Sequence, residues 1–324
     1  MALKVSSLQH KIAERLISIF INIFCSLRIN KLPSMNKASQ KVFTSLWKRA
    51  NLQSFLDFSP IRRFIDLSQI RFPLGETSKT SISIVIPCHP KDHALLSVVL
   101  EGLKRNCLNP ITEIIIVSPE PLQFEHFPET NIRFVNDSEI VDAKLLETIK
   151  TNFPQSQFGW IFQQVLKIQT AMNFTRNDHI LVIDSDTVIS KRTLFVDENR
   201  QILNITREYH RQYIKQYQNF TKSNFDIGLS FVTHYQLWQR DILEELWGGD
   251  RLYEWLSCAD TSSISSMSEY HSYGSYIIQN HPKRFEFSQW ANAELSRTDM
   301  NDLSYEAVAC ASRDARSISI HSYS

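Results

Sequence analysis

Between residues 80 and 190 the apolar positions follow two alternating patterns. Short, mostly apolar runs predict buried strands over 81–86, 113–117, 132–135 and 179–183. Between these runs, apolar residues recur with the helical period and predict helices over 94–105, 140–150 and 160–172. Strands that alternate with helical crossovers predict an α/β fold with a mostly parallel central sheet, right-handed connections and helices on both faces.

The pattern is less regular after residue 190. We predict a hairpin over 193–205 with its turn at 197–200, an exposed helix over 209–220 and a buried strand over 225–232. Two helical pieces follow on either side of Gly248 and Gly249, and then come a helix over 304–312 and a final strand over 317–324. A nucleotide-binding-like first half is therefore expected to continue into an irregular second half.

Length and composition fit this picture. The chain has 324 residues, of which 43% are hydrophobic and 21% charged, so it can bury a large core. Its five cysteines are an odd number and contain no C-x-x-C pair, which argues against a disulfide framework or a zinc ribbon. We expect one large α/β domain with an appendage, in a reducing compartment.

The charge balance divides the chain into two parts. Residues 1–80 hold 13 Lys and Arg side chains against 4 Asp and Glu, whereas the remaining residues hold 22 against 30. The turn-forming stretch 71–80 lies at the boundary. We therefore predict a basic, amphipathic helical segment over 1–80 and a separate domain over 81–324.

The basic segment contains an apolar stretch, 16–27, in which twelve uncharged residues lie between Arg15 and Arg28. As a helix it would be about 18 Å long, short of the roughly 30 Å hydrocarbon core of a bilayer. It suits a helix lying on an anionic membrane surface, or one packed against protein, and both interpretations stay open. No nucleic-acid-binding motif accompanies the basic residues. We expect a cytoplasmic protein, peripheral on the inner face of the plasma membrane.

Polar residues follow the predicted strands, at the edge of a parallel sheet where ligands bind. Pro87, His89 and Asp92 follow the first strand, and Asp184 and Asp186 follow the fourth. Two carboxylates one residue apart can hold a hard divalent cation that neutralises a diphosphate. The alternative is an ordinary turn with solvated aspartates.

Three further positions offer chemistry. Trp160, Gln164 and Lys167 share one face of a predicted helix and suit phosphate and sugar hydroxyls, although a solvated helix face is the alternative. Glu269 stands among tyrosines, as a general base or as a helix-capping residue. His321 lies in the last strand, as a metal ligand or as a surface histidine.

Four motifs occur in a characteristic order: "SIVIPCHPKD", "GWIFQQVLK", "ILVIDSDTVI" and "SEYHSYGSYI". Together they resemble the bacterial GT-A-type glycosyltransferases. The resemblance is to a poorly characterised glycosyltransferase-like group with a G-W-x-x-Q-Q-x-x-K helix ahead of its D-x-D motif. It covers about residues 81–324 and leaves out the basic segment.

The resemblance implies the GT-A fold of nucleotide-diphospho-sugar transferases and a hexosyltransferase-like activity. A UDP- or GDP-sugar donor would bind with its base and ribose near His89 and Asp92. Asp184 and Asp186 would hold Mn²⁺ or Mg²⁺ on the diphosphate, and His321 matches a late histidine that reaches the metal in many such enzymes. The acceptor would be a saccharide, a lipid-linked glycan or another glycoconjugate, as in polysaccharide biosynthesis.

Two other functions remain to be weighed. "DSDTV" fits the D-x-D-x-[TV] signature of haloacid-dehalogenase-type phosphatases, in which Asp184 would be the nucleophile and Asp186 a general acid. The nucleophile strand should open such a domain, whereas about three predicted strands precede it here. The second alternative is a catalytically inactive GT-A binding module, which turnover of a donor sugar would exclude.

Overall fold

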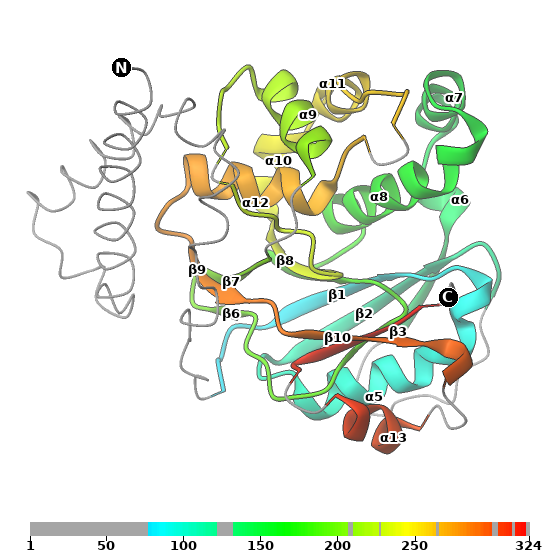
Figure 1. Cartoon of the computed structure of the whole chain (residues 1–324), viewed down its shortest axis with the longest axis vertical. Helices are drawn as coiled ribbons and strands as arrows, with labels where there is room; N and C mark the ends of the chain where they lie inside the picture. Colours follow the sequence, from blue (N-terminus) through cyan, green and yellow to red (C-terminus); the bar gives the residue numbers. More distant parts are fainter. Residues whose placement is uncertain are drawn as a thin grey trace, which may run out of the picture.

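The computed structural model in Figure 1 describes most of the chain beyond the basic segment. It covers residues 77–121, 132–206, 210–226, 228–263, 266–299, 304–312 and 315–321. The amphipathic helix predicted over 16–27 lies outside the described residues, as does the basic segment up to residue 76. Among the residues described, no helix combines the length and the apolar character needed to cross a membrane.

A five-stranded sheet forms the centre of the described structure, in the order β3-β2-β1-β4-β8. Its strands are β1 (Ile82–Pro87), β2 (Ile111–Ser118), β3 (Ile132–Asn136), β4 (His179–Ile183) and β8 (Tyr235–Gln239). The first four are parallel, and β8 runs antiparallel to β4. The prediction of a mostly parallel α/β sheet is therefore confirmed.

The crossover helices lie where the apolar period predicts them, with shifted ends. They are the 3-10 helix η3 (Pro90–Leu95) and the α-helices α5 (Leu96–Asn106), α6 (Asp137–Ile140), α7 (Ala143–Asn152) and α8 (Gln155–Asn173). The predicted helix over 140–150 is split because Asn136 and Asp142 each cap a helix with a side-chain oxygen. The long helix α8 begins directly after Pro154, which suits a first turn that needs no amide donor.

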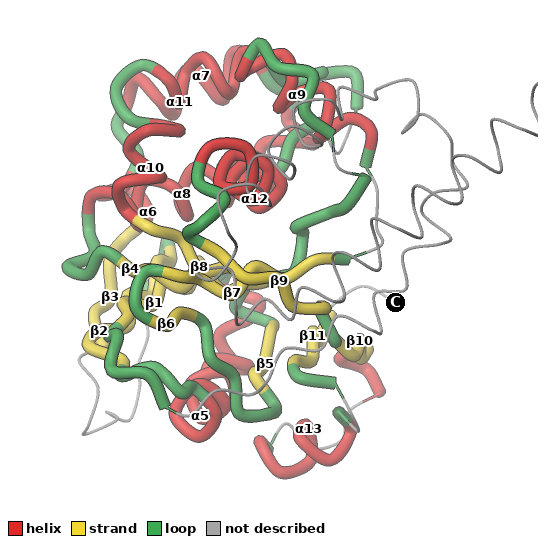
Figure 2. The backbone as a smooth tube through the Cα atoms, turned by 90° about the vertical axis from the view of Figure 1, so that its left-hand side faces the viewer, coloured by secondary structure: helices red, strands yellow, loops and turns green. Residues whose placement is uncertain are grey.

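Helices cover both faces of the sheet, as predicted (Figures 1 and 2). Alternate residues of the same strands point into two separate cores: Val85 and Val182 pack with α7, α8, α10 (Arg240–Trp247), α11 (Arg251–Ser257) and α12 (Glu269–Asn280). Ile84 and Leu181 pack on the other side with α5. Strands buried on both faces explain why the sequence shows mostly apolar runs here.

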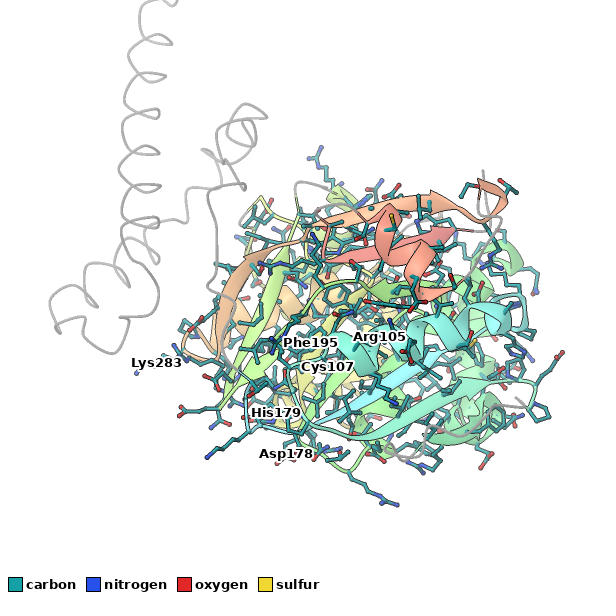
Figure 3. All side chains as sticks on the ribbon, turned by 90° about the horizontal axis from the view of Figure 1, so that it is seen from below. Arg105, Cys107, Asp178, His179, Phe195 and Lys283 are labelled. Carbon is teal, nitrogen blue, oxygen red and sulfur yellow. The ribbon has the colours of Figure 1, made fainter. Side chains whose placement is uncertain are left out.

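Figure 3 looks onto the face covered by α5 and α13 (Tyr305–Ala311), where the labelled Arg105 and Cys107 mark the end of α5. Arg105 Nη1 contacts Glu306 Oε1 of α13 at 2.7 Å. Asp178 and His179, also labelled, mark the amino end of β4. The carboxyl end of β4, which Asp184 follows, is therefore at the opposite edge of the sheet.

Two smaller sheets come from the second half of the chain. One has the order β6-β7-β9 and the other β10-β11-β5. Their strands are β5 (Thr187–Ile189), β6 (Val196–Asp197), β7 (Arg200–Ile205), β9 (Phe285–Gln289), β10 (Asn292–Ser296) and β11 (Ser317–His321). The antiparallel pair β6–β7 confirms the predicted hairpin, and β11 confirms the predicted last strand.

Two predictions for the second half are wrong. Residues 225–226 and 228–232 do not form a strand: Asp226 Oδ1 accepts a hydrogen bond from the Gly228 amide, and Ser230 forms an isolated bridge with Thr206. The buried Phe231 enters the core from this loop and packs on Gly274 of α12, where a Cβ atom would lie 2.3 Å from its ring. The helix α9 (Arg211–Thr221) is not fully exposed, because it buries one face that includes Tyr217.

Arg240 fixes the end of α8 relative to the sheet. Its guanidinium donates to the carbonyls of Met172, Thr175 and Asn177 at 2.5–2.8 Å, where the last turn of a helix leaves acceptors without partners. Since Arg240 directly follows β8, one side chain ties β8 and α8 together. α8 carries residues of the candidate site, and β8 begins directly after another of them.

Candidate active site

The residues around the D-x-D motif meet at one edge of the central sheet. β4 ends at Ile183, so Asp184 lies at its carboxyl end. The antiparallel strand β8 starts at this same edge, which places His234 opposite Asp184, and the Asp184 amide donates to the His234 carbonyl at 2.9 Å. α12 lies above β8 in Figure 1, and its first turn supplies Glu269 and Tyr270.

Both oxygens of Asp184 are held by neighbours. Oδ1 lies 2.6 Å from Lys167 Nζ and accepts a hydrogen bond from the Tyr270 hydroxyl at 3.3 Å. Oδ2 accepts a hydrogen bond from His234 Nδ1 at 3.2 Å. Burial favours the neutral carboxyl, but Lys167 and His234 outweigh it and hold the pKa of Asp184 well below its usual range. Asp184 is therefore a fixed anion.

Lys167 is the buried cation of the site. Only 3% of the residue is exposed, and Nζ contacts Asp184 at 2.6 Å, Glu269 Oε1 at 2.8 Å and the Tyr270 ring at 4.4 Å. Burial disfavours the ammonium, but the two carboxylates raise the pKa of Lys167 well above its usual value. In this arrangement the ammonium is fully engaged by protein groups rather than turned towards solvent.

Gln164 and Trp160 complete the same face of α8. Gln164 is 2% exposed, and its Oε1 accepts from the Glu269 amide at 3.0 Å while its Nε2 donates to the Trp160 carbonyl. Trp160 stacks on Tyr213 of α9, with ring centroids 6.3 Å apart. This face therefore packs against α9 and α12, and the alternative of a solvated helix face is wrong.

Glu269 occupies the first turn of α12, where Ser268 caps the helix by accepting from the His271 amide. Its Oε1 is bound by Lys167, whereas no hydrogen bond to Oε2 is present among the described residues. The residue is 4% exposed. One carboxylate oxygen is thus fixed by the lysine, and the other retains the capacity to accept a proton.

Asp186 and His321 come together from positions 135 residues apart in the sequence. β5 pairs antiparallel with β11, and the Ile320 amide donates to the Asp186 carbonyl at 2.8 Å. This register brings His321 Nδ1 to 3.4 Å from Asp186 Oδ2, and both side chains are partly exposed. A carboxylate oxygen of the D-x-D motif and an imidazole nitrogen thus lie side by side.

The structure of the loop after β1 differs from the expectation that His89 and Asp92 bind the base and ribose of a donor. Pro87 is buried as the last residue of β1, and His89 is exposed and caps η3 by accepting from the Lys91 amide at 3.2 Å. Asp92 is buried, and its two oxygens bind Arg297 at 2.6 Å and Ser185 at 3.2 Å. Through Ser185, Asp92 braces the turn that contains the D-x-D motif.

The sequence patterns do not predict two residues of the site. The predicted strand over 225–232 leaves no place for a strand that begins after His234, so neither β8 nor the role of His234 is predicted. The role of Tyr270 as a partner of Asp184 and Lys167 was also missed. The useful signal for His234 would have been its position just before "YQLWQ", since an antiparallel neighbour of β4 begins where the parallel strands end.

The chemistry of the donor set fits a divalent cation. Asp184 and Glu269 both contact Lys167, and Asp186 adds a carboxylate that pairs with His321. Asp186 and His321 supply the oxygen and nitrogen ligands that Mn²⁺ accepts, whereas Asp184 is occupied by its own partners. In the part of the chain that the structure describes, no three His, Cys, Asp or Glu side chains are grouped as a complete metal site.

His271 on α12 gives a pH dependence that can be tested. Burial, with a smaller effect of His210, lowers the pKa of His271 to about 3 from an ordinary 6.5. Between these values the unfolded chain binds a proton that the folded chain does not, so the free energy of unfolding falls as the pH drops below 6.5. The expected loss is about 2 kcal/mol by pH 5. Urea unfolding of the wild type and of His271→Gln between pH 7.5 and 5 measures it. Equal slopes in the two proteins would contradict the assignment.

Comparison with known proteins gives no further guide to this site, because no family model and no curated protein matches the sequence.

Proposed function

We propose that this chain is a metal-dependent glycosyltransferase of the GT-A type, which moves a sugar from a nucleotide-diphosphate sugar to a glycan, lipid-linked or other glycoconjugate acceptor. The single observation that carries the proposal is the pairing of Asp186 with His321 at 3.4 Å, at the carboxyl edge of a mostly parallel sheet. Ligands of α/β sheets bind at this edge. The four sequence motifs that resemble this family support the same function.

Each residue of the site has a separate role in this proposal. Asp186 and His321 would hold Mn²⁺ or Mg²⁺, which when bound would neutralise the donor diphosphate and the departing nucleoside diphosphate. Asp184 is kept anionic by Lys167, and His234 and Tyr270 fix its orientation. Glu269 accepts the proton of the acceptor hydroxyl through the oxygen that Lys167 does not bind.

The same geometry disfavours a phosphatase. A nucleophilic aspartate needs an oxygen free to attack phosphorus. Asp184 instead has Oδ1 bound by Lys167 and Tyr270 and Oδ2 bound by His234, and its side chain is 17% exposed. β4 also follows three other strands of the central sheet in sequence, where a nucleophile strand should come first.

We infer from the basic segment where the proposed enzyme acts. A cytoplasmic enzyme held on an anionic membrane surface by residues 1–80 would act where lipid-linked acceptors are found. This part of the proposal rests on the sequence alone.

A thermal-shift screen tests the proposed function. The full chain is heated with UDP-, GDP- and CDP-sugars, each with and without Mn²⁺. A ligand that binds only the native state at 100 times its Kd stabilises it by about 2.7 kcal/mol, so one nucleotide should raise the Tm when Mn²⁺ is present. A Tm that responds to none of the nucleotides would contradict the proposal.

The role of Glu269 predicts a specific kinetic defect. Glu269→Gln should lower the rate of sugar transfer by about 10²-fold or more, because only proton removal is lost. Donor and Mn²⁺ affinity should stay unchanged, since the amide oxygen still accepts from Lys167. Single-turnover kinetics with donor binding measured in parallel provides the test. Glu254→Gln, at an exposed position on α11, is the control, and unchanged turnover in Glu269→Gln would leave Glu269 a purely structural partner of Lys167.

A further inference from the structure

His234 has an unusual backbone conformation for its position. Its φ is +56°, in the left-handed region that side chains other than glycine seldom adopt. Glu198 and Lys222 share this feature, but they lie in the turn of a hairpin and at the end of α9, where it is common. His234 instead lies directly before β8, the edge strand of the central sheet, and contacts Asp184 of the D-x-D motif. Backbone strain at such a place calls for a reason.

The reason is visible in the contacts of His234 with Asp184. The His234 carbonyl accepts from the Asp184 amide at 2.9 Å, and its Nδ1 donates to Asp184 Oδ2 at 3.2 Å. One residue therefore holds both the main chain and the side chain of Asp184. The left-handed conformation lets the carbonyl and the ring reach the same neighbour.

The D-x-D turn has a second anchor on its other side. There the Ile320 amide donates to the Asp186 carbonyl at 2.8 Å. The His234 ring joins the two anchors, because its centroid lies 5.5 Å from that of His321 and 5.3 Å from that of Trp290. A shift of His234 would therefore displace both Asp184 and the Asp186–His321 pair.

We propose that His234 is the positioning residue of the D-x-D motif, which holds Asp184 by main chain and side chain so that Asp186 and His321 face the donor diphosphate in a fixed arrangement. This inference rests on the proposed function for its ligand. His234 acts through Asp184 and is not itself a group that touches the substrate. The strained backbone is retained because the fixed arrangement requires it.

Three substitutions separate the backbone from the hydrogen bond. His234→Asn keeps a donor in the place of Nδ1 and tolerates the left-handed region. His234→Gly removes the donor but accepts the backbone conformation, and His234→Ala removes the donor and keeps the strain. His281→Asn is the matched control, at an exposed ion pair with Glu245 that follows the far end of α12.

The test measures the Tm of each variant and its affinity for UDP, and in parallel GDP, in the presence of Mn²⁺. We expect His234→Ala and His234→Gly both to bind at least tenfold more weakly than the wild type, although the Tm of the glycine variant exceeds that of the alanine variant by about 2–4 °C. His234→Asn and His281→Asn should bind within about threefold of the wild type. Affinity would then follow the hydrogen bond and not stability, which a purely structural role does not predict.

Wild-type affinity in His234→Gly, or an affinity of His234→Asn as weak as that of His234→Ala, would overturn the assignment of His234 while leaving the proposed function intact. If the wild type itself binds neither nucleotide with Mn²⁺, the proposed function fails and the ligand-dependent part of this inference falls with it.

Discussion

Replacing Lys167 with methionine is expected to lower the free energy of unfolding by about 3–5 kcal/mol, because the substitution leaves two carboxylates buried without their cation. Asp184 and Glu269 lie 2.6 and 2.8 Å from the ammonium, and no other lysine or arginine among the described residues forms an ion pair with either carboxylate. Methionine fills a similar volume, so the loss reports charge and not packing. Urea denaturation at pH 7 measures it.

The matched control is Lys150→Met, which removes an exposed lysine from α7 and should change stability by less than about 0.5 kcal/mol. Adding Glu269→Gln to Lys167→Met should restore part of the lost stability, since one of the two uncompensated charges is then gone. A Lys167→Met protein as stable as the wild type would mean that the three groups do not form the buried network described above.

Replacing Asp186 with alanine is expected to abolish Mn²⁺-dependent nucleotide binding, with a loss of affinity of about 10²-fold or more. Asp186 and His321 are the two ligands proposed for the cation, and a site left with a single imidazole loses both charge and geometry. Stability should change little, because the Asp186 side chain is partly exposed and its carbonyl still accepts from Ile320. Calorimetric titration with UDP or GDP, with and without Mn²⁺, provides the measurement.

Asp178→Ala serves as the control for this loss, because Asp178 is an exposed aspartate at the opposite end of β4 and should leave binding unchanged. His321→Ala should weaken Mn²⁺-dependent binding by less than Asp186→Ala, since the carboxylate charge remains. Full binding by Asp186→Ala would remove the D-x-D motif from the proposed metal site.

The parallel strands were predictable from the sequence for a physical reason. β1, β2 and β4 are covered on both faces, so most of their residues are apolar and the strands stand out from the helices between them. β8 lies beside β4 and is fully buried, yet it reads "YQLWQ". Gln236 and Gln239 can be buried there because Gln236 donates to the Tyr270 carbonyl and Gln239 donates to Gln201 Oε1. Hydrogen bonds between distant residues thus conceal a core strand from an analysis of hydrophobicity.

The residues of the candidate site also differ in how far the sequence predicts them. The D-x-D motif and the α8 face were visible because both depend on local spacing. The burial of Lys167 was not, since a lysine on a helix face is ordinarily solvated and its two carboxylate partners come from β4 and α12. The position of His321 beside Asp186 follows from the register of β11 on β5, which local sequence does not encode. His234 is marked only by its position directly before β8, because its role depends on a backbone conformation that the sequence pattern does not encode.

The most direct test of the central claim is a crystal structure of the full chain with Mn²⁺ and the nucleotide selected by the thermal-shift screen, with the metal located by its anomalous scattering. If the chain is the proposed glycosyltransferase, the anomalous peak marks a Mn²⁺ ion that is coordinated by Asp186 Oδ2 and a His321 ring nitrogen. Diphosphate oxygens complete the coordination. A peak far from both side chains, or a nucleotide bound away from the carboxyl edge of β4, would contradict it.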